Sequence, residues 1–252
     1  MTENERLPKR LDQALVERGA FQSRARAQAA IKAGLVRVGG VVAGKPSTNI
    51  LPDTEVLVDG DAHPYVSRGG VKLDAALRAF EIDPAGKTCL DLGASTGGFT
   101  DVLLRAGARK VYAIDVGTGQ LSPEIVGDAR VVNLEKTHAK ELTKALIPDP
   151  IDVLVCDVSF ISLKKALPPA LGLCGPRARL AALVKPQFEV GRAALGKGGL
   201  VRPGYANSFG VAEDMAVWMG AQEGWKSLGT MASPIKGGDG NQEFLLGAVK
   251  AA

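Results

Sequence analysis

The residues from Leu90 to Thr100 have the types and spacing of a loop that holds a nucleotide-like ligand. An apolar strand from Thr88 to Leu92 leads into Gly93 and Gly97, after which we expect a helix. A side chain at either glycine would keep a ligand from lying against the backbone. The first turn of the helix offers N–H groups that have no partner within the helix. A strand, a glycine turn and a helix in this order predict a nucleotide-type pocket.

The spacing of the glycines indicates which ligand the loop holds. A dinucleotide-binding loop has Gly-x-Gly-x-x-Gly, whose middle glycine lets a pyrophosphate approach the backbone. This chain has Gly93-x-Ser95-x-x-Gly98, and the serine would crowd a pyrophosphate. We therefore expect a ligand without phosphates, such as an adenosyl sulfonium. Asp115 follows a second strand (Lys110 to Ile114) about 20 residues further on, where a carboxylate accepts from ribose hydroxyls. This offset weakens the alternative of a purely structural turn.

Two more strands are followed by charged residues that an apolar strand does not explain. Asp157 comes directly after the strand Asp152 to Cys156. Lys185 comes directly after the strand Leu180 to Val184. Ligands in open α/β sheets bind beyond the carboxyl ends of the strands, and a lysine at such a buried position is unfavourable unless it is paired or functional. Asp157 is therefore either part of the chemistry or simply the ion-pair partner of Lys185.

Alternating strands and helices position these residues. The further elements that we expect are strands near Arg130, Trp225 and Gln242 and helices from Ser67, which would be the cap, from Ala139, from Leu163 and from Asn207 to Gln222. This alternation predicts a Rossmann-like α/β fold with a mostly parallel sheet covered on both faces. The stretch from Gly191 to Gly204 is expected to be a mobile loop or a plain surface connection.

Positive charge is concentrated near the N-terminus. Between Arg6 and Lys45 there are nine lysines and arginines but only two acids, Asp12 and Glu17. This segment therefore carries a net charge of +7, while the whole chain carries +4. Charge segregated in this way suggests a separate module that binds a polyanion. A solvated helix surface is the alternative, because charge runs usually form one.

The same segment has the pattern of a small α+β unit. Its expected elements are a helix around Leu11 to Leu15 that ends near Gly19, a helix that Ser23 caps and that ends at Gly34, a hairpin around Gly39-Gly40, and a strand from Glu55 to Val58. We therefore divide the chain into a module at residues 1–60, a linker at 61–66 and an α/β domain at 67–252.

Length and composition exclude several classes of protein. No apolar run in the 252 residues approaches the roughly 18–20 residues that span a bilayer. The charged N-terminus has no secretory signal, so we expect a cytoplasmic protein that does not enter a membrane. Cys89, Cys156 and Cys174 lack metal-binding spacing, and the chain has only two histidines, so we expect no metal.

The N-terminal segment carries the set Arg10-Leu11-Asp12, Ser23-Arg24, Ala27, Ile31, Gly34 and Val36-x-Val38. In these positions it resembles the S-four RNA-binding module of ribosomal proteins and RNA-modifying enzymes. Gly39 departs from that pattern, which often has asparagine there. The resemblance implies RNA binding, and the residues that we expect to contact RNA are Arg6, Lys9, Arg10, Arg24, Arg26, Lys32 and Arg68.

A second set of motifs covers nearly the whole chain. They are Ser67-Arg-Gly-Gly-x-Lys72, Leu90 to Thr100, Asp115-Val-Gly-x-Gly-Gln-Leu121, Asp157-Val-Ser-Phe-Ile-Ser162, Val184-Lys-Pro-Gln-Phe-Glu-Val-Gly191 and Ser233-Pro…Gly240-Asn-x-Glu243. In these motifs the chain resembles the TlyA family of ribosomal RNA ribose 2′-O-methyltransferases, some of which are labelled hemolysins. The resemblance implies an FtsJ-like catalytic domain, S-adenosylmethionine as cofactor, and ribosomal RNA or ribosomal subunits as partner. It favours a cytidine as the target.

The resemblance also implies the site residues. The Lys-Asp-Lys-Glu tetrad of FtsJ-type enzymes falls on Lys72, Asp157, Lys185 and Glu243. The residues expected to bind the cofactor are Asp91, Gly93, Ala94, Ser95, Thr96, Gly97, Phe99, Asp115, Val116 and Asp157. We expect Lys185 to take the proton of the ribose hydroxyl while the other three members position it.

Three other functions remain as alternatives. A non-catalytic RNA-binding factor of ribosome assembly would not need the tetrad, which this chain keeps. A membrane-active hemolysin would need a spanning segment or a long apolar helix face. A nicotinamide-dependent dehydrogenase is disfavoured by Ser95. One local departure from the family pattern is Lys136-Thr-His138, where Arg-Thr-Asn is common, and we interpret His138 as a surface or helix-start residue.

Overall fold

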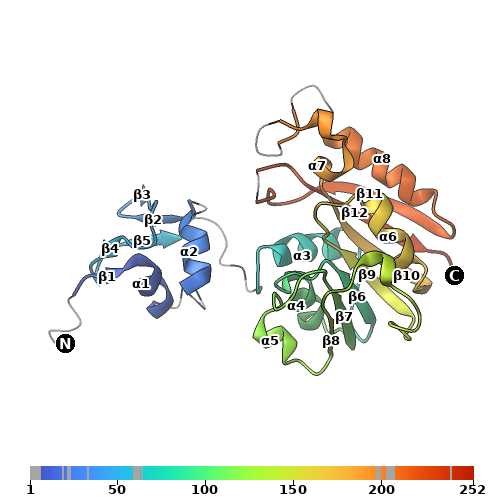
Figure 1. Cartoon of the computed structure of the whole chain (residues 1–252), viewed down its shortest axis with the longest axis horizontal. Helices are drawn as coiled ribbons and strands as arrows, with labels where there is room; N and C mark the ends of the chain where they lie inside the picture. Colours follow the sequence, from blue (N-terminus) through green and yellow to red (C-terminus); the bar gives the residue numbers. More distant parts are fainter. Residues whose placement is uncertain are drawn as a thin grey trace. The chain divides into compact units, whose positions relative to one another are not determined.

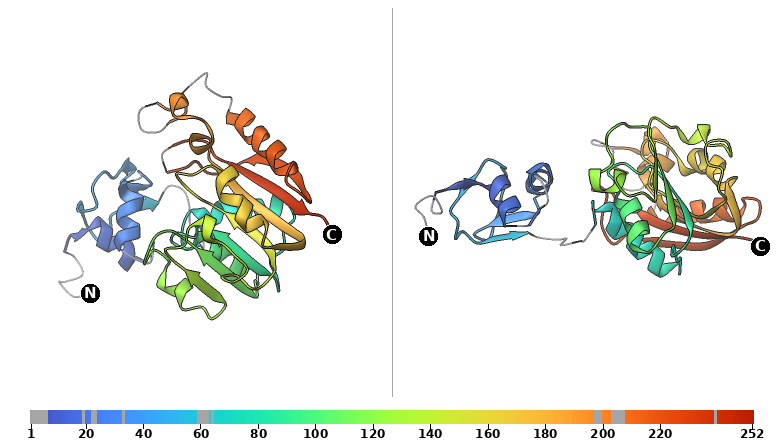
Figure 2. Two further views of the ribbon diagram at one scale, coloured as in Figure 1. Left: turned by 45° about the vertical axis from the view of Figure 1, so that its right-hand side comes forward. Right: turned by 90° about the horizontal axis from the view of Figure 1, so that it is seen from below.

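The chain forms two units, Met1–His63 and Pro64–Ala252 (Figures 1 and 2). The computed structural model describes residues 7–18, 20–21, 24–32, 34–58, 63, 65–196, 200–202, 208–238 and 240–252. Arg6, Gly19, Ser23 and parts of the glycine-rich stretch lie outside these residues. Within the described ranges, no helix is long and apolar enough to cross a membrane.

The N-terminal unit joins two helices to two small sheets through one core. Its elements are β1 (Lys9–Arg10), α1 (Leu11–Glu17), α2 (Arg24–Lys32), β2 (Val36–Val38), β3 (Val41–Val42), β4 (Asn49–Ile50) and β5 (Val56–Val58). Strand β1 pairs with β4, and β2 lies between β3 and β5. Gly39 and Gly40 turn the β2–β3 hairpin with φ values of +57° and +80°, a conformation that glycine adopts easily. The predicted hairpin is confirmed.

A seven-stranded sheet in the order β11-β12-β10-β9-β6-β7-β8 forms the centre of the second unit. Its strands are β6 (Thr88–Leu92), β7 (Lys110–Ile114), β8 (Val131–Leu134), β9 (Ile151–Cys156), β10 (Cys174–Val184), β11 (Trp225–Ala232) and β12 (Phe244–Lys250). All pairings among β6 to β10 are parallel, whereas β12 is antiparallel to both of its neighbours. The predicted Rossmann-like sheet is confirmed as a mixed sheet, because β12 runs antiparallel to both β10 and β11.

Helices cover both faces of this sheet. They are α3 (Gly69–Ala79), α4 (Gly98–Arg105), α5 (Pro123–Val126), η2 (Ala139–Glu141), α6 (Leu163–Leu171), α7 (Pro186–Glu189), η3 (Arg192–Ala194) and α8 (Ser208–Gly220). Consecutive residues of β6 pack into hydrophobic clusters on opposite faces of the sheet. Cys89 packs in the cluster that contains Leu103 of α4, and Leu90 packs in the cluster that contains Met215 of α8. Alternate residues of a strand point to opposite faces, so both faces of β6 are buried.

Two helix starts differ from the sequence expectation. Arg68 rather than Ser67 occupies the cap position of α3, and no side chain caps that helix. The Ser67 hydroxyl instead lies against Gly98, where an added Cβ would overlap it. The helix expected from Ala139 is only a single 3-10 turn. His138 caps that turn by accepting from the N–H of Lys140 at 3.1 Å, which confirms it as a helix-start residue.

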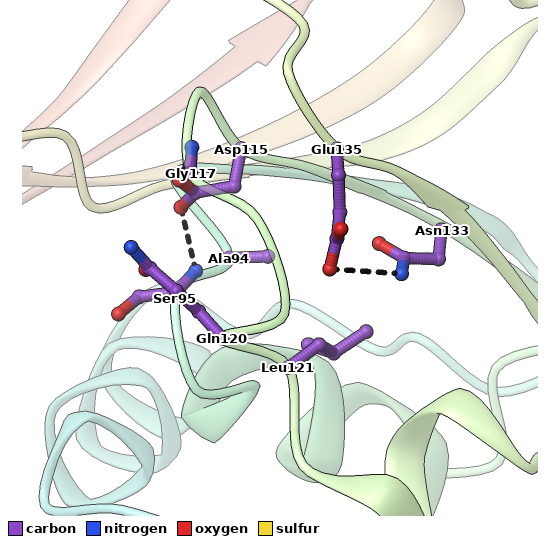
Figure 3. Close-up of a pocket in the computed structure, with 8 residues that line it drawn as sticks. All are labelled: Ala94, Ser95, Asp115, Gly117, Gln120, Leu121, Asn133 and Glu135. Atoms are coloured by element: carbon purple, nitrogen blue, oxygen red, sulfur yellow. Dashed lines mark hydrogen bonds between the residues drawn. The ribbon is translucent and has the colours of Figure 1, made fainter.

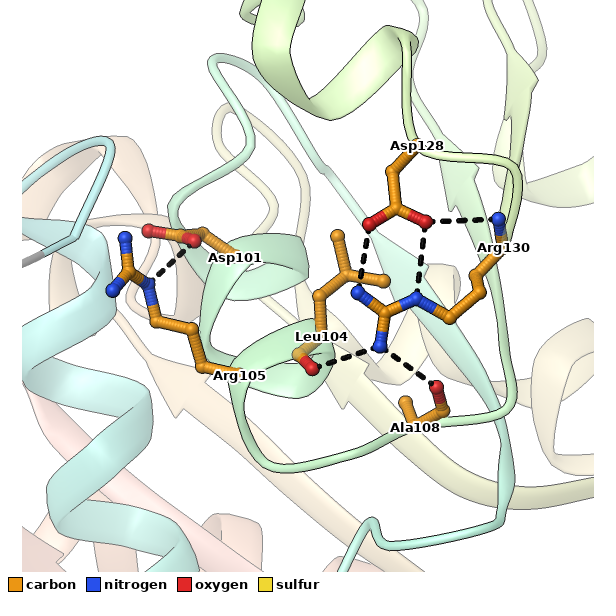
Figure 4. A network of polar contacts seen from close by, with 6 residues as sticks. All are labelled: Asp101, Leu104, Arg105, Ala108, Asp128 and Arg130. Atoms are coloured by element: carbon orange, nitrogen blue, oxygen red, sulfur yellow. Dashed lines mark hydrogen bonds and ion pairs between the residues drawn. The ribbon is translucent and has the colours of Figure 1, made fainter.

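Polar contacts fasten helix α4, which follows the glycine loop. Arg130, at the start of β8, donates to the carbonyl oxygen of Leu104 at 3.0 Å and pairs with Asp128 at 2.7 Å (Figure 4). Hydrogen bonds from Arg130 hold the pKa of the Asp128 carboxyl at about 2. On the other side, the N–H of Val66 donates to Asp101 of α4 at 2.8 Å. The edge strand and the first residues of the unit are thus both tied to the helix on which the loop ends.

Gly247→Ala should destabilise the second unit. The added Cβ would overlap the ring of Phe80, and overpacking of this kind costs about 1–3 kcal/mol. Gly210→Ala in α8 is the matched control, because nothing lies within 4 Å of its added Cβ and alanine is favoured over glycine in helices by about 1 kcal/mol. In thermal unfolding the first variant should melt below the wild type and the second at or above it. Equal melting temperatures of the two variants would contradict the close packing of Phe80 against Gly247.

Candidate active site

The glycine loop lies directly against the end of strand β9. Gly93 has a φ of +88°, and a Cβ added there would come to 2.6 Å from the carbonyl oxygen of Asp157. Gly97 has a φ of +95°, and its added Cβ would come to 2.9 Å from the side chain of Leu121. Contacts within the protein therefore already require both glycines. From the sequence we expected a ligand to require these glycines, because the close approach of the end of β9 to Gly93 is a tertiary contact.

The carboxylate of Asp115 holds the loop in an unusual conformation. Ser95 has a φ of +47°, which residues other than glycine adopt rarely. Its N–H donates to Asp115 Oδ2 at 2.7 Å, and Asp115 Oδ1 accepts from the N–H of Gly117 at 2.7 Å (Figure 3). Asp115 thus links the loop after β6 to the loop after β7. Its carboxylate also borders the pocket between these two loops.

This pocket opens at the carboxyl ends of β6, β7 and β8. Its lining residues are Ala94, Ser95, Asp115, Gly117, Gln120, Leu121, Asn133 and Glu135. We predicted the first three as cofactor ligands from the sequence. Gly117, Gln120 and Leu121 lie in a motif that the sequence showed but for which no role was predicted, and Asn133 in β8 and Glu135 directly after it were not predicted. Among the remaining cofactor candidates, Thr96 and Val116 are exposed, whereas Gly97 and Phe99 are buried. Phe99 lies in the core that contains α3 and α4.

Asp91 on β6 is a buried carboxyl group with an unsatisfied oxygen. Thr100 Oγ1 donates to Asp91 Oδ2 at 2.7 Å. Within the described part of the chain, no group hydrogen-bonds to Asp91 Oδ1. Burial raises the pKa of this carboxyl to about 7. A buried acceptor without a partner is unfavourable, so a donor that reached Oδ1 would stabilise the protein.

The four tetrad residues form two lysine–carboxylate pairs. Lys185 Nζ lies 2.6 Å from Asp157 Oδ1 and donates to Ser159 Oγ at 2.8 Å. Lys72 Nζ lies 2.5 Å from Glu243 Oε2, and both side chains are nearly buried, with exposures of 11% and 4%. Lys185 and Asp157 therefore do form the ion pair that the sequence left as an alternative. In the described ranges, no group of three or more His, Cys, Asp or Glu side chains could hold a metal ion.

Strand register brings the two pairs to one edge of the sheet. Strands β10 and β12 are antiparallel, with Val184 opposite Phe244. Lys185 directly follows the first of these residues and Glu243 directly precedes the second, so the two are neighbours across the ladder. Lys72 comes from α3, which packs against both strands. Four segments that are distant in the sequence thus meet at the carboxyl end of β10.

The loop after β9 and the helix after β10 are joined at two further points. Glu189 of α7 accepts from Ser162 Oγ at 2.6 Å and from the N–H of Leu163 at 2.8 Å, at the start of α6. The ring of Phe188 lies 5.2 Å from that of Phe160, measured between centroids, and Phe160 is 91% exposed. Phe160, Ser162, Phe188 and Glu189 lie in family motifs, but no role could be predicted for them, because a helix cap and a ring contact depend on tertiary distances.

Three of the seven basic residues expected to bind RNA pair with an acidic residue in the described ranges. Arg10 and Arg24 pair with Asp12 at 3.0 and 3.1 Å, and Lys9 pairs with Glu17 at 2.6 Å. Hydrogen bonds from Arg10 first, and then from Gln28 and Arg24, hold the pKa of Asp12 well below its usual range although burial opposes them. The other candidates are Lys32 and Arg68, which are exposed, and Arg6 and the side chain of Arg26, which lie outside the described parts. Arg68 belongs to the second unit.

Comparison with known proteins identifies the family. The model of the FtsJ-like methyltransferase family matches residues 65–250, and that of the S4 domain, the S-four module, matches residues 9–56. A relative from Mycobacterium tuberculosis, named 16S/23S rRNA (cytidine-2′-O)-methyltransferase TlyA, is 47% identical over 94% of this chain and 88% of its own length. The chain belongs to the TlyA family of FtsJ-like methyltransferases.

Other TlyA-like proteins agree with this assignment. A relative from Brachyspira hyodysenteriae, named Hemolysin A, is 40% identical over 94% of this chain and 98% of its own length. A solved structure from Streptococcus thermophilus that carries a hemolysin label is 38% identical, with a TM-score of 0.75, and covers 97% of this chain and 89% of that one. The resemblance drawn from the motifs is therefore confirmed, including its S-four module and its FtsJ-like domain.

Asp91→Asn should change how the stability of the protein depends on pH. The pKa of Asp91 is about 7 in the folded protein and near 4 in an unfolded chain. The folded state therefore binds this proton more tightly, and stability should fall as the pH rises from about 4 to about 7. Asparagine keeps an acceptor for Thr100 and cannot ionise, so the variant should lose this decline. Urea unfolding of both proteins at about pH 5 and about pH 8 measures the change in stability between the two pH values. The same change in the variant as in the wild type would contradict the burial of an ionisable Asp91.

Proposed function

We propose that this protein transfers the methyl group of S-adenosylmethionine to the ribose 2′-hydroxyl of a cytidine in ribosomal RNA. The observation that carries the proposal is the meeting of the Lys185–Asp157 and Lys72–Glu243 pairs at the carboxyl end of the sheet, next to the glycine loop. The relative from Mycobacterium tuberculosis is named for 2′-O-methylation of cytidine in 16S and 23S ribosomal RNA, which supports the same substrate class here. The partner would be ribosomal RNA, free or in a ribosomal subunit.

The chemistry of the pocket suits a cationic ligand without phosphates. Its lining includes the carboxylates of Asp115 and Glu135 and contains no lysine or arginine among the described residues. Such a lining repels a pyrophosphate and attracts the ammonium and sulfonium charges of S-adenosylmethionine. The unsatisfied Oδ1 of Asp91 offers a buried acceptor nearby, on the strand that leads into the loop. These features favour S-adenosylmethionine over a nicotinamide dinucleotide.

Three acidic residues and the loop backbone would hold the cofactor. We assign this role to Asp91, Asp115 and Asp157, with Gly93 to Gly97 as the surface against which the cofactor lies. Ser95 belongs to that surface, since the Asp115 contact fixes its backbone. When bound, the cofactor supplies an electrophilic methyl group.

Lys185 Nζ is the group that we assign to receive the proton of the ribose hydroxyl. A ribose hydroxyl is a weak nucleophile, and it must lose its proton as the new bond to carbon forms. Asp157 Oδ1, 2.6 Å from Nζ, and Ser159 Oγ, 2.8 Å from it, hold the lysine side chain in place at the end of β10.

Lys72 and Glu243 act as a positioning pair in this scheme. Their contact is nearly buried, and their charges compensate each other, so the pair adds a fixed dipole rather than a net charge. Because Glu243 neighbours Lys185 across the β10–β12 ladder, the pair restricts where the Lys185 side chain and the ribose can lie. Alignment of hydroxyl and methyl donor supplies a large part of the rate in such transfers.

Lys185→Ala should lower the rate of methyl transfer by about 100-fold or more, because the base is lost. Lys185→Arg should be nearly as slow, because a guanidinium does not give up its proton. The matched control is Lys164→Ala, which removes an exposed lysine from α6. Transfer of labelled methyl from S-adenosylmethionine to unmodified ribosomal RNA measures the rate, and calorimetry checks that each variant still binds the cofactor. A wild-type rate for either Lys185 variant would refute its assignment as the base.

A further inference from the structure

The buried carboxylate of Asp12 joins two arginines from different elements of the N-terminal unit. Arg10 of β1 donates from Nε to Asp12 Oδ1 at 3.0 Å and from Nη2 to Oδ2 at 3.1 Å. Arg24, the first residue of α2, donates from Nη2 to the same Oδ2 at 3.1 Å. Gln28, one turn further along α2, donates to Oδ2 at 2.6 Å. Asp12 has no exposed surface, so protein donors rather than solvent satisfy it.

This arrangement forces the two guanidinium groups together. Both Nη2 atoms lie 3.1 Å from one oxygen atom, so they can be no further apart than twice that distance. Two cations this close repel each other unless an anion lies between them. The single charge of Asp12 compensates only one of them and leaves one net positive charge. The side chains of Arg10 and Arg24 remain 41% and 51% exposed, so a ligand can reach both.

We propose that Arg10 and Arg24 form one binding site for a single phosphate group of the RNA backbone, and that Asp12 is the positioning residue that builds it. Guanidinium groups recognise phosphate through paired N–H donors, and a phosphate has enough oxygens to accept from two of them. The inference rests on the proposed action on ribosomal RNA. It adds that these two side chains act as a unit and that an acidic residue is required for binding a polyanion.

Arg18 shows that the arginines of this unit are not equivalent. Its guanidinium donates to the backbone carbonyl oxygens of Leu51, Pro52 and Thr54 at 3.2, 2.8 and 2.9 Å. These contacts use Arg18 to hold the segment between β4 and β5. Arg10 and Arg24 instead converge on a side chain and stay partly exposed, so an anion can reach both of them.

Asp12→Asn distinguishes the proposed phosphate site from a general electrostatic attraction, because the two predict opposite changes in the affinity for RNA. The substitution adds one unit of positive charge, so a general electrostatic attraction would make RNA binding tighter. Loss of the bridging anion should instead separate the guanidinium groups and weaken binding about fivefold to tenfold, with a salt dependence smaller by about one phosphate contact. The measurement is the affinity of the full chain for ribosomal RNA transcribed in vitro, at several salt concentrations.

Glu17→Gln is the matched control. It makes the same charge change in the same unit, at the exposed pair with Lys9, and should leave binding unchanged or slightly tighter. The weakening caused by Asp12→Asn should also disappear when Arg10 and Arg24 are both alanine, because no pair is then left to position. Tighter binding by Asp12→Asn, or equal weakening in the double-alanine background, would overturn the proposal, since the second result indicates only a structural role.

A second variant keeps the proposal testable if Asp12→Asn does not fold. Replacement of both Arg10 and Arg24 by lysine keeps every charge but removes the paired donors, and it should weaken RNA binding to a similar extent. Wild-type affinity in that variant would overturn the proposal. Binding is measured without S-adenosylmethionine, so it is independent of methyl transfer. A protein that binds RNA through this site yet transfers no methyl group would refute the proposed reaction and leave the phosphate site standing.

Discussion

Lys185 directly follows strand β10, and an ammonium group at the end of a buried strand is stable only beside an anion. Asp157 provides that anion at 2.6 Å, from the end of the neighbouring strand β9. The backbone of Asp157 in turn lies so close to the loop after β6 that only glycine fits at position 93. The ion pair and this backbone contact together link the ends of three strands. The Asp115 carboxylate then joins the glycine loop to the loop after β7, and the pocket lies between these two loops.

A buried ion pair seldom adds net stability, because the desolvation of both charges offsets their attraction. The two lysine–carboxylate pairs are therefore better explained by the chemistry they allow than by the fold they support. They place two ammonium groups at one edge without leaving net charge there. The N-terminal unit uses the same principle in a different way, since a buried Asp12 brings two cations together for an anionic ligand.

Much of the fold could be predicted, because it depends on local patterns. The runs of apolar residues placed β6 and β7 at their observed limits, and the glycine pair placed the hairpin. The tetrad came from family motifs rather than from spacing, and the register of β10 and β12 then explains why Lys185 and Glu243 meet. What failed were features that depend on distant contacts. Ser67 has the residue type of a cap but packs against Gly98 instead.

Dependence on distant contacts also explains which features of the site could not be predicted. No local pattern shows that Glu189 caps a helix from another segment, or that Asp115 accepts from the backbone of Ser95. Gly117, Gln120 and Leu121 lie in a family motif for which no role was predicted, and Asn133 and Glu135 reach the pocket only because β8 pairs with β7. The unsatisfied oxygen of Asp91 likewise requires coordinates, since the sequence shows only an acid within an apolar strand.

Transfer of the methyl group to a ribose oxygen of ribosomal RNA is tested most directly by mass spectrometry of nucleosides. Unmodified ribosomal RNA is first incubated with the protein and with S-adenosylmethionine that carries a deuterated methyl group. We expect the label in 2′-O-methylcytidine, and we expect its appearance to depend on Lys185. Label on a nucleobase, or no label in ribosomal RNA whether free or in subunits, would contradict it.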